Sequence, residues 1–206
     1  MALPSEPRFR VHHALRIKGF AKIDHLVDLA GIDEHPLTIH LDAMKCDGLA
    51  QFREARELWQ LTPAGREAHQ PALETDAARP GFREGLGLRY PSVLELNEEF
   101  KALCGDWQLR DGAPNDHADA TYDAAVIARL GVLDRRAQEV AHAFGTVAER
   151  FACYAPRLAR SRSAVEAGQP TMFTGVMCGS YHDVWMELHE DLLLTQRIDR
   201  MAEGSF

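Results

Sequence analysis

Imidazole and aromatic side chains recur at helical spacing near the C-terminal end of the sequence. His182, Trp185 and His189 stand at i, i+3 and i+7, so on a helix they lie on or beside one face. Two imidazoles and an indole on a partly buried face are suited to lining a small-molecule pocket. A polar segment at 105–117 holds further hydrogen-bonding groups. We therefore expect a ligand site formed by Asp106, Trp107, His117, Tyr181, His182, Trp185 and His189.

The spacing of these histidines argues against a metal site. His182 and His189 are seven residues apart, whereas two ligands on one helix chelate a metal at i, i+3 or i, i+4. Catalysis is an alternative, because either imidazole could act as a general base oriented by Asp106, Asp116 or Glu187. We expect no metal, no cofactor and no catalytic residue. A cofactor-free enzyme or an accessory subunit acting on a small metabolite stays open as the second hypothesis.

The composition is that of an ordinary globular chain. Of the 206 residues, 46% are hydrophobic and 26% are charged, which argues against disorder. No apolar stretch approaches the roughly 20 residues of a membrane span, and the N-terminal residues show no secretion signal. Cys46, Cys104, Cys153 and Cys178 form no CxxC pair, which indicates reduced thiols. We expect a cytoplasmic protein without a membrane partner.

The net charge of −8 is unevenly distributed along the chain. Residues 1–70 carry nine Lys and Arg against ten Asp and Glu, together with six of the ten histidines. The rest of the chain carries fourteen Lys and Arg against twenty-one Asp and Glu. Because the first part is nearly neutral, the total charge does not exclude a nucleic-acid partner for it.

The N-terminal part shows a compact succession of elements. Asp33 is a candidate N-cap for the third helix, and Thr62 followed by Pro63 is a strong helix start. The alternation and spacing of apolar residues predict three helices and two short strands: 8–20, 22–30 and 34–46, then 49–53 and 58–61. A fourth helix begins at Pro63. Helix, helix–turn–helix, β-hairpin and helix follow one another in the order of a winged helix.

Residues 8–70 also resemble the winged-helix domains of MarR-type and related bacterial regulators. The resemblance rests on Asp47-Gly48-Leu49, the hairpin, and the segment Leu61-Thr62-Pro63-Ala64-Gly65-Arg66. In that family a Gly-Leu pair opens the wing, and a Leu-Thr-x-x-Gly segment begins the next helix. The resemblance implies a winged helix that binds DNA.

The side chains available to such a domain limit its DNA contacts. A winged helix reads base edges from its third helix and holds phosphates from its wing. We expect the DNA contacts to come from Thr38, His40, Lys45, Arg53 and Arg56. The third helix has no Arg or Gln for bidentate base recognition, and several carboxylates lie close by. A module for packing, dimerisation or protein binding that lacks the nucleic-acid role is therefore the alternative.

Residues 71–91 are rich in Pro and Gly and predict a broken connection, although Pro71–Arg79 is rich in Ala and Glu and suits a helix. Residues 92–206 then show helical periodicity without strand-like alternation. Apolar residues at helical spacing predict four helices. The first two cover 93–103 and 119–144, the third covers 147–158 with a break near Pro156, and the last covers 181–197 with Ser180 as its N-cap. We expect domains at 1–70 and 92–206, the second an antiparallel helical bundle for ligand binding or dimerisation.

The C-terminal part carries a second resemblance. The patterns DWQLRxG, NDHxDxxYDAAV and SYHxVWxELHEDLL are similar to a helical region of actinobacterial proteins. Those proteins are described as MarR-like regulators or as parts of pyruvate, phosphate dikinase-related polypeptides. The resemblance covers about residues 90–196. It implies a link to regulators or to phosphoenolpyruvate-utilising polypeptides, and no phosphotransfer signature is visible in this sequence.

The remaining notable residues receive structural interpretations. We expect His12, His13, His25, His35, His40 and His69 on solvated or DNA-proximal faces. Trp59 is interpreted as a packing residue. The acidic pairs Glu98-Glu99 and Glu190-Asp191 are interpreted as solvated helix faces.

These inferences combine into one hypothesis. The chain is mainly α-helical, with an N-terminal winged helix and a C-terminal helical bundle. We expect a homodimeric, ligand-responsive transcriptional regulator, in which a bound small molecule changes how two winged helices meet DNA.

Overall fold

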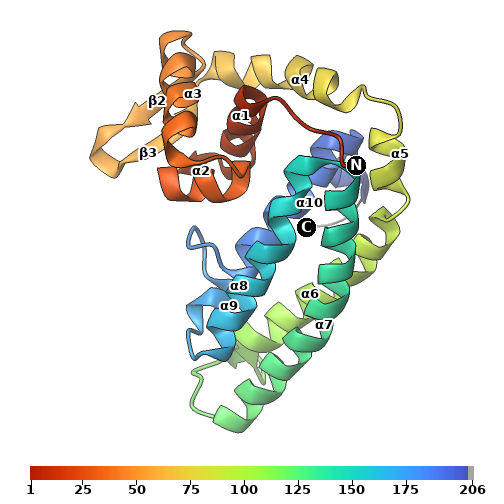
Figure 1. Ribbon diagram of the computed structural model, residues 1–206. Helices are drawn as coiled ribbons and strands as arrows, with labels where there is room; N and C mark the ends of the chain where they lie inside the picture. Colours follow the sequence, from red (N-terminus) through yellow and green to blue (C-terminus); the bar gives the residue numbers. More distant parts are fainter. Residues whose placement is uncertain (204–206) are drawn as a thin grey trace.

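The computed structural model describes residues 1–203 and is mainly helical, with a small antiparallel sheet (Figure 1). No helix within these residues is long and apolar enough to cross a membrane. The longer elements are α1 (Pro7–Lys18), α2 (Ile23–Ala30), α3 (Glu34–Cys46), α4 (Pro63–Ala77), α6 (Tyr90–Gln108), α7 (Ala120–Val147), α8 (Tyr154–Glu166) and α10 (Tyr181–Gln196). The shorter ones are α5 (Phe82–Gly87), α9 (Thr171–Thr174), α11 (Arg200–Glu203), the 3-10 helices η1 (Glu54–Arg56) and η2 (Glu149–Cys153), and the strands β1 (Phe20–Ala21), β2 (Ala50–Arg53), β3 (Leu58–Leu61), β4 (Leu109–Arg110) and β5 (Ala113–Pro114).

The predicted helices and strands of the N-terminal part are confirmed to within a few residues. Thr62 caps α4 by accepting a hydrogen bond from the Gly65 amide. β3 lies between β1 and β2, and Trp59 on β3 is buried against Phe52. Strand β1 was not predicted, because two residues acquire strand geometry here only by pairing with β3, forty residues later in the chain.

The segment 71–91 is more helical than its Pro and Gly content predicts. Helix α4 continues through Pro71 to Ala77, and α5 and the start of α6 follow, with turns at 78–81 and 88–89. Phe82 and Leu86 of α5 are fully buried. The segment is therefore packed against α7 and α10 and is not a free connection.

The C-terminal helices α6, α7, α8 and α10 run beside one another and form the elongated lower part of the molecule in Figure 1. The predicted final helix is confirmed, and Ser180 caps it by accepting from the Asp183 amide. The predicted break in the third stripe lies at Ala148 and η2, just before Pro156. One pairing was not indicated by any strand-like alternation, because β4 and β5, of two residues each, form a short hairpin.

A buried polar cluster joins α1 and α4 to α10. His13 Nε2 lies 2.9 Å from Asp191 Oδ1, and His13 Nδ1 lies 2.9 Å from His69 Nε2. Arg150 bonds the same carboxylate, and the Tyr154 hydroxyl donates to its second oxygen. We call these five residues the Asp191 cluster. A neutral His13 that donates to Asp191 accepts at its other nitrogen from His69, so both contacts are satisfied.

Two sequence-based expectations are therefore wrong. His12, His13 and His69 are buried between helices and not on a solvated or DNA-proximal face. Asp191 is almost fully buried, although Glu98 and Glu99 are exposed as expected. The cause is tertiary, because helices α1 and α4 cover the face of α10 that carries Asp191.

A second set of ion pairs ties the same helices together. Glu187 of α10 accepts from Lys18 of α1 at 2.5 Å and from Arg157 of α8 at 2.6 Å. Arg157 also forms an ion pair with Asp28 of α2 at 3.0 Å, and the exposed Arg160 pairs with the same carboxylate. These charges are drawn from helices far apart in the sequence, so they form only when the N-terminal and C-terminal parts are in contact.

The buried histidines predict that stability falls in mild acid. Burial, together with His13 and His12, lowers the pKa of His69 to about 2, and burial also lowers the pKa of His12 and of His13. Below about pH 6.5 the unfolded chain therefore takes up protons that the folded chain does not. We expect His69 alone to lower the free energy of unfolding by about 2 kcal/mol between pH 7.5 and 5, with His12 and His13 adding to the fall.

Urea denaturation at a series of pH values measures this. In His69→Gln the fall in the free energy of unfolding should be smaller by the contribution of one histidine. His35→Gln, at an exposed site, is the control, and an unchanged pH dependence in His69→Gln would contradict the prediction.

The Asp191 cluster predicts a large cost for removing its negative charge. Burial alone would raise the pKa of Asp191, but Arg150 and His13 outweigh it and hold the pKa well below its usual range. Asp191→Asn leaves the buried Arg150 with Asp76, at 3.3 Å, as its remaining counter-charge, and should lower the free energy of unfolding by about 3 kcal/mol, the lower end of the cost of breaking a buried pair. The neighbouring Glu190→Gln should cost less than about 1 kcal/mol, because Glu190 makes partly exposed ion pairs. Urea denaturation at pH 7.5 measures both, and equal losses would contradict this interpretation.

Candidate functional site

A cavity of about 270 Å³ lies between α6 and α10. It forms where one stripe of each helix faces the other: positions 97, 101, 104, 105 and 108 on α6, and 182, 186 and 189 on α10. We call it the α6–α10 cavity, and it is lined by Asn97, Phe100, Lys101, Cys104, Gly105, Gln108, His182, Met186 and His189. Two of the predicted ligand residues, His182 and His189, therefore meet in one cavity.

The polar groups of this cavity are mainly hydrogen-bond donors. Asn97 is almost fully buried, and its Oδ1 accepts a hydrogen bond of 3.0 Å from Trp185 Nε1, which leaves the amide NH₂ as its other polar group. Lys101 contributes an ammonium group that pairs at 3.0 Å with Glu98 at the surface. The buried Nδ1 of His182 makes no hydrogen bond with the described residues. None of the described lining residues carries a carboxylate.

Burial sets the protonation states of the cavity. Burial, assisted by Arg200, lowers the pKa of His189 to about 4, so its imidazole is neutral near pH 7. Burial raises the pKa of the Cys104 thiol to about 12, so this thiol stays protonated and is a poor nucleophile. The arrangement is therefore better suited to holding a ligand by hydrogen bonds, with Lys101 as the charged group, than to nucleophilic chemistry.

Gly105 leaves the α6 wall of the cavity open. A Cβ built on Gly105 would meet no atom within 4 Å, and its φ is not positive. Packing therefore does not require glycine at this position, although glycine within a helix costs about 1 kcal/mol relative to alanine. By contrast, a Cβ on Gly65 would lie 1.9 Å from the Leu49 carbonyl oxygen.

The other predicted ligand residues lie elsewhere. Trp185 and Tyr181 are buried behind the cavity, and the Tyr181 hydroxyl donates to Asp134 at 3.1 Å. Asp106 and Trp107 lie on the last turn of α6 between the lining residues Gly105 and Gln108, but they do not line the cavity, and they gather with His117. There Trp107 packs against His117 with ring centroids 4.5 Å apart, His117 pairs with Asp123, and Asp106 pairs with Arg129. The structure thus brings two of the seven residues into a cavity and separates the rest.

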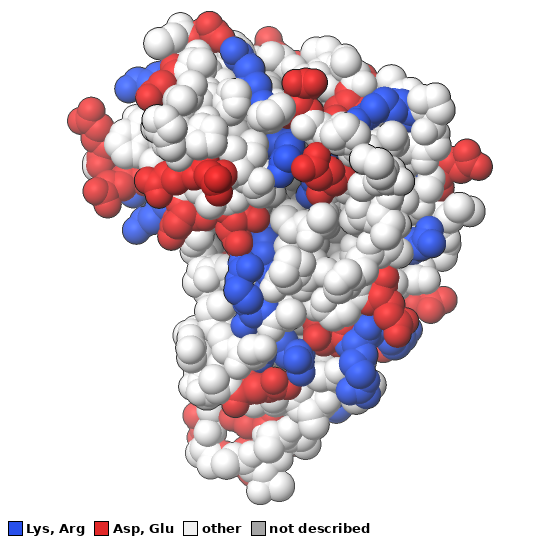
Figure 2. Space-filling view, viewed as in Figure 1, with Lys and Arg blue, Asp and Glu red and all other residues white. Residues whose placement is uncertain are grey.

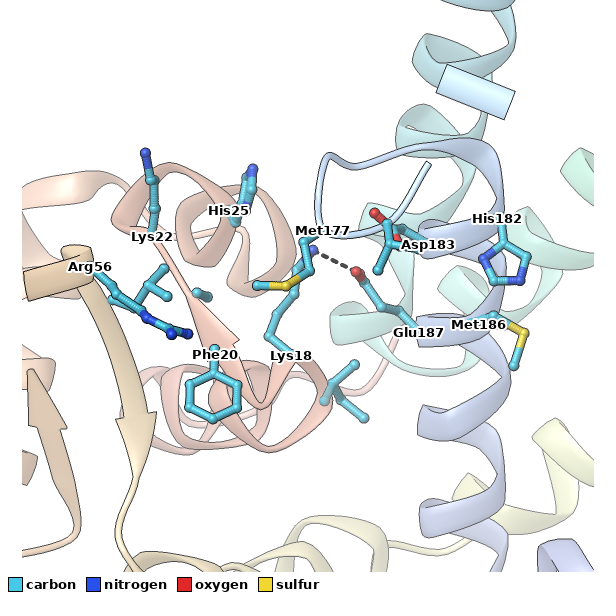
Figure 3. A pocket seen from close by; sticks show the side chains of 14 residues that line it. Lys18, Phe20, Lys22, His25, Arg56, Met177, His182, Asp183, Met186 and Glu187 are labelled. Carbon is cyan, nitrogen blue, oxygen red and sulfur yellow. Dashed lines mark hydrogen bonds and ion pairs between the residues drawn. The ribbon is translucent and has the colours of Figure 1, made fainter. Parts of the chain in front are cut away.

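A second cavity, of about 420 Å³, lies between the N-terminal part and α10 (Figure 3). We call it the interface cavity. Lys18, Lys22 and Arg56 line it from the N-terminal side, and Met177 and Glu187 line it from the C-terminal side. Glu187 is neutralised by Lys18, whereas Lys22 and Arg56 make no ion pair with any residue within 1–203.

Helix α10 is the wall that both cavities share. His182 and Met186 border the interface cavity and the α6–α10 cavity. In Figure 3 both side chains project from the flank of α10 that lies away from Arg56. A molecule bound between α6 and α10 would therefore touch side chains that also border the N-terminal part.

The residues predicted to contact DNA lie on α3 and the β2–β3 hairpin. Lys45, Arg53 and Arg56 are exposed. Thr38 and His40 are half-buried, and the Thr38 hydroxyl donates to the Glu34 carbonyl at 2.8 Å within α3. Only the three cations are fully available to a partner on this surface.

Carboxylates surround these cations. Glu34 and Asp42 are exposed on α3, and Glu54 and Glu57 flank Arg56 at the hairpin tip. Figure 2 shows acidic side chains gathered over the left side of the molecule, where Figure 1 places the hairpin and α2. The exposed Ile39 adds an apolar side chain to α3. Any contact with phosphates must therefore rely on a few basic groups.

Sequence reasoning missed the α6 half of the cavity. Asn97, Lys101, Gly105 and Gln108 recur at i, i+4, i+8 and i+11, which is a polar stripe next to the apolar one. That stripe was visible in the sequence. Its partner was not, because periodicity within one helix does not show which other helix it faces.

Comparisons of the chain with protein-family models, curated proteins and solved structures find no match.

The two glycines predict opposite responses to alanine. Gly105→Ala adds a methyl group in open space and should raise the free energy of unfolding by about 0.5–1 kcal/mol. Gly65→Ala must displace the backbone of Leu49 and should lower it by about 1–3 kcal/mol. Urea denaturation of both variants measures the two effects. Destabilisation by Gly105→Ala would show that packing constrains this wall.

Proposed function

We propose that this protein is a ligand-responsive, DNA-binding transcriptional regulator. In this proposal α1–α4 with β1–β3 form a winged helix, and the helices from α6 onward form an antiparallel bundle that binds the ligand. The order helix, two helices, hairpin and helix supports the first part. The cavity that His182 and His189 share supports the second.

The observation that carries the proposal is the position of α10. Its His182 and Met186 border both cavities, and its Glu187 is paired with Lys18 of α1. A ligand beside α10 therefore acts next to the contacts that hold the N-terminal part. Such a ligand changes DNA affinity only by as much as its own affinity differs between the free and the DNA-bound arrangement.

The proposed DNA contacts use Lys45, Arg53 and Arg56, with Thr38 and His40 closer to the bases. Two copies of the chain are proposed to form a homodimer, so that two α3 helices meet successive major grooves. Because the basic groups are few, affinity should depend on a small number of phosphate contacts. The proposed location is the cytoplasm.

Selection from a random double-stranded DNA library, followed by gel shifts, tests the proposal. We expect inverted repeats with half-sites about 10 base pairs apart and an affinity that falls as salt rises. Lys45→Gln and Arg53→Gln should each weaken binding and reduce the slope of log K against log salt by about 0.9 per lost phosphate contact.

Arg89→Gln is the matched control, because Arg89 is exposed on the turn before α6. Its affinity and salt slope should equal those of the unchanged protein. If no sequence is enriched, or if the Lys45 and Arg53 variants bind like the control, the DNA-binding role is wrong.

A further inference from the structure

The α6–α10 cavity differs from the interface cavity in the charge of its walls. The interface cavity is bordered by charges of both signs, Asp183 and Glu187 together with three cations, whereas the described residues that line the α6–α10 cavity include no carboxylate. Lys101 is its charged group near neutral pH, because burial keeps the pKa of His189 low. The Lys101 ammonium is shared with Glu98 at the surface, so the walls offer one partly paired cation together with polar hydrogens.

The donors are held in fixed positions. The Asn97 side chain is 3% exposed, and its carbonyl oxygen is occupied by Trp185, so the amide NH₂ is directed by that hydrogen bond. Lys101 lies one turn further along α6 on the same stripe. The buried Nδ1 of His182 adds a polar atom that no described residue satisfies. An unsatisfied buried nitrogen is unfavourable, and a hydrogen bond from a ligand or water would relieve it.

The remaining walls are apolar. Phe100 and Met186 face the cavity from the two helices, and the protonated Cys104 behaves as a small apolar group. Gly105 has no side chain, so the cavity extends over a part of α6 that a larger residue would fill. At about 270 Å³, the cavity is slightly smaller than the range typical of drug-sized ligands.

We propose that the α6–α10 cavity binds a compact organic anion, with the anionic group at Asn97 and Lys101 and the apolar body against Phe100 and Met186. This inference deepens the proposed function by naming the ligand class of its regulatory site. Binding is measured without DNA, so its failure is distinguishable from failure of DNA binding.

The experiment compares three probes that share one apolar body and differ in charge: 4-phenylbutanoate, 4-phenylbutanamide and 4-phenylbutylammonium. Isothermal titration calorimetry with the full chain should give an affinity for the carboxylate at least tenfold above that for the amide. The ammonium probe should not bind measurably. Equal affinities for the carboxylate and the amide, or preference for the ammonium probe, would overturn the proposal.

Three variants locate the site. Gly105→Leu fills the cavity from a helical position without a positive φ and should abolish binding of the carboxylate. Lys101→Gln leaves the cavity open and should lower the affinity about tenfold, so the test does not depend on one variant folding. Arg56→Gln removes an unpaired cation of the interface cavity and should leave the affinity unchanged. Binding that survives Gly105→Leu, or that is lost in Arg56→Gln, would place the anion elsewhere and refute the assignment.

Discussion

The buried Asp191 carboxylate determines how the N-terminal and C-terminal parts of this protein are joined, because His13 of α1 hydrogen-bonds to it from across the junction. A buried charge is tolerated only when it is paired and hydrogen-bonded. Asp191 meets that condition with groups from three other elements: Arg150 on η2, Tyr154 on α8 and His13 on α1. His69 of α4 extends the same cluster through His13. The position of α1 against α10 is therefore set by hydrogen-bond geometry as well as by apolar contact.

This join limits how a ligand can act. Separating α1 from α10 would remove His13 from the buried Asp191 carboxylate and would also break the Lys18–Glu187 pair. A large hinge motion between the N-terminal and C-terminal parts is accordingly costly. Small displacements of α10 side chains cost less, and His182 and Met186 lie where such displacements reach both cavities. The proposed regulation therefore works through α10 itself rather than through domain separation.

Sequence periodicity predicted most helices well, because an amphipathic stripe reflects the face that each helix must bury. Caps at Thr62 and Ser180 were equally visible, since capping is a local interaction. Of the residues predicted to bind a ligand, His182 and His189 line one cavity, whereas Trp107 and His117 form a separate contact beside the last turn of α6. Residue type and spacing on one helix indicated a site but did not show which second helix would complete it.

The sequence by itself determined the mainly helical class, most of the longer helices, the hairpin and the uneven charge along the chain, because each depends on residue types and on neighbours within a few turns. Only the tertiary structure decided the burial of His13, His69 and Asp191, the pairing of β1 with β3, and the meeting of Asn97 with His182 across two helices. These features join residues that are from 38 to 178 positions apart. Their physical cause is the packing of one helix face on another, and no local pattern encodes the partner of a face.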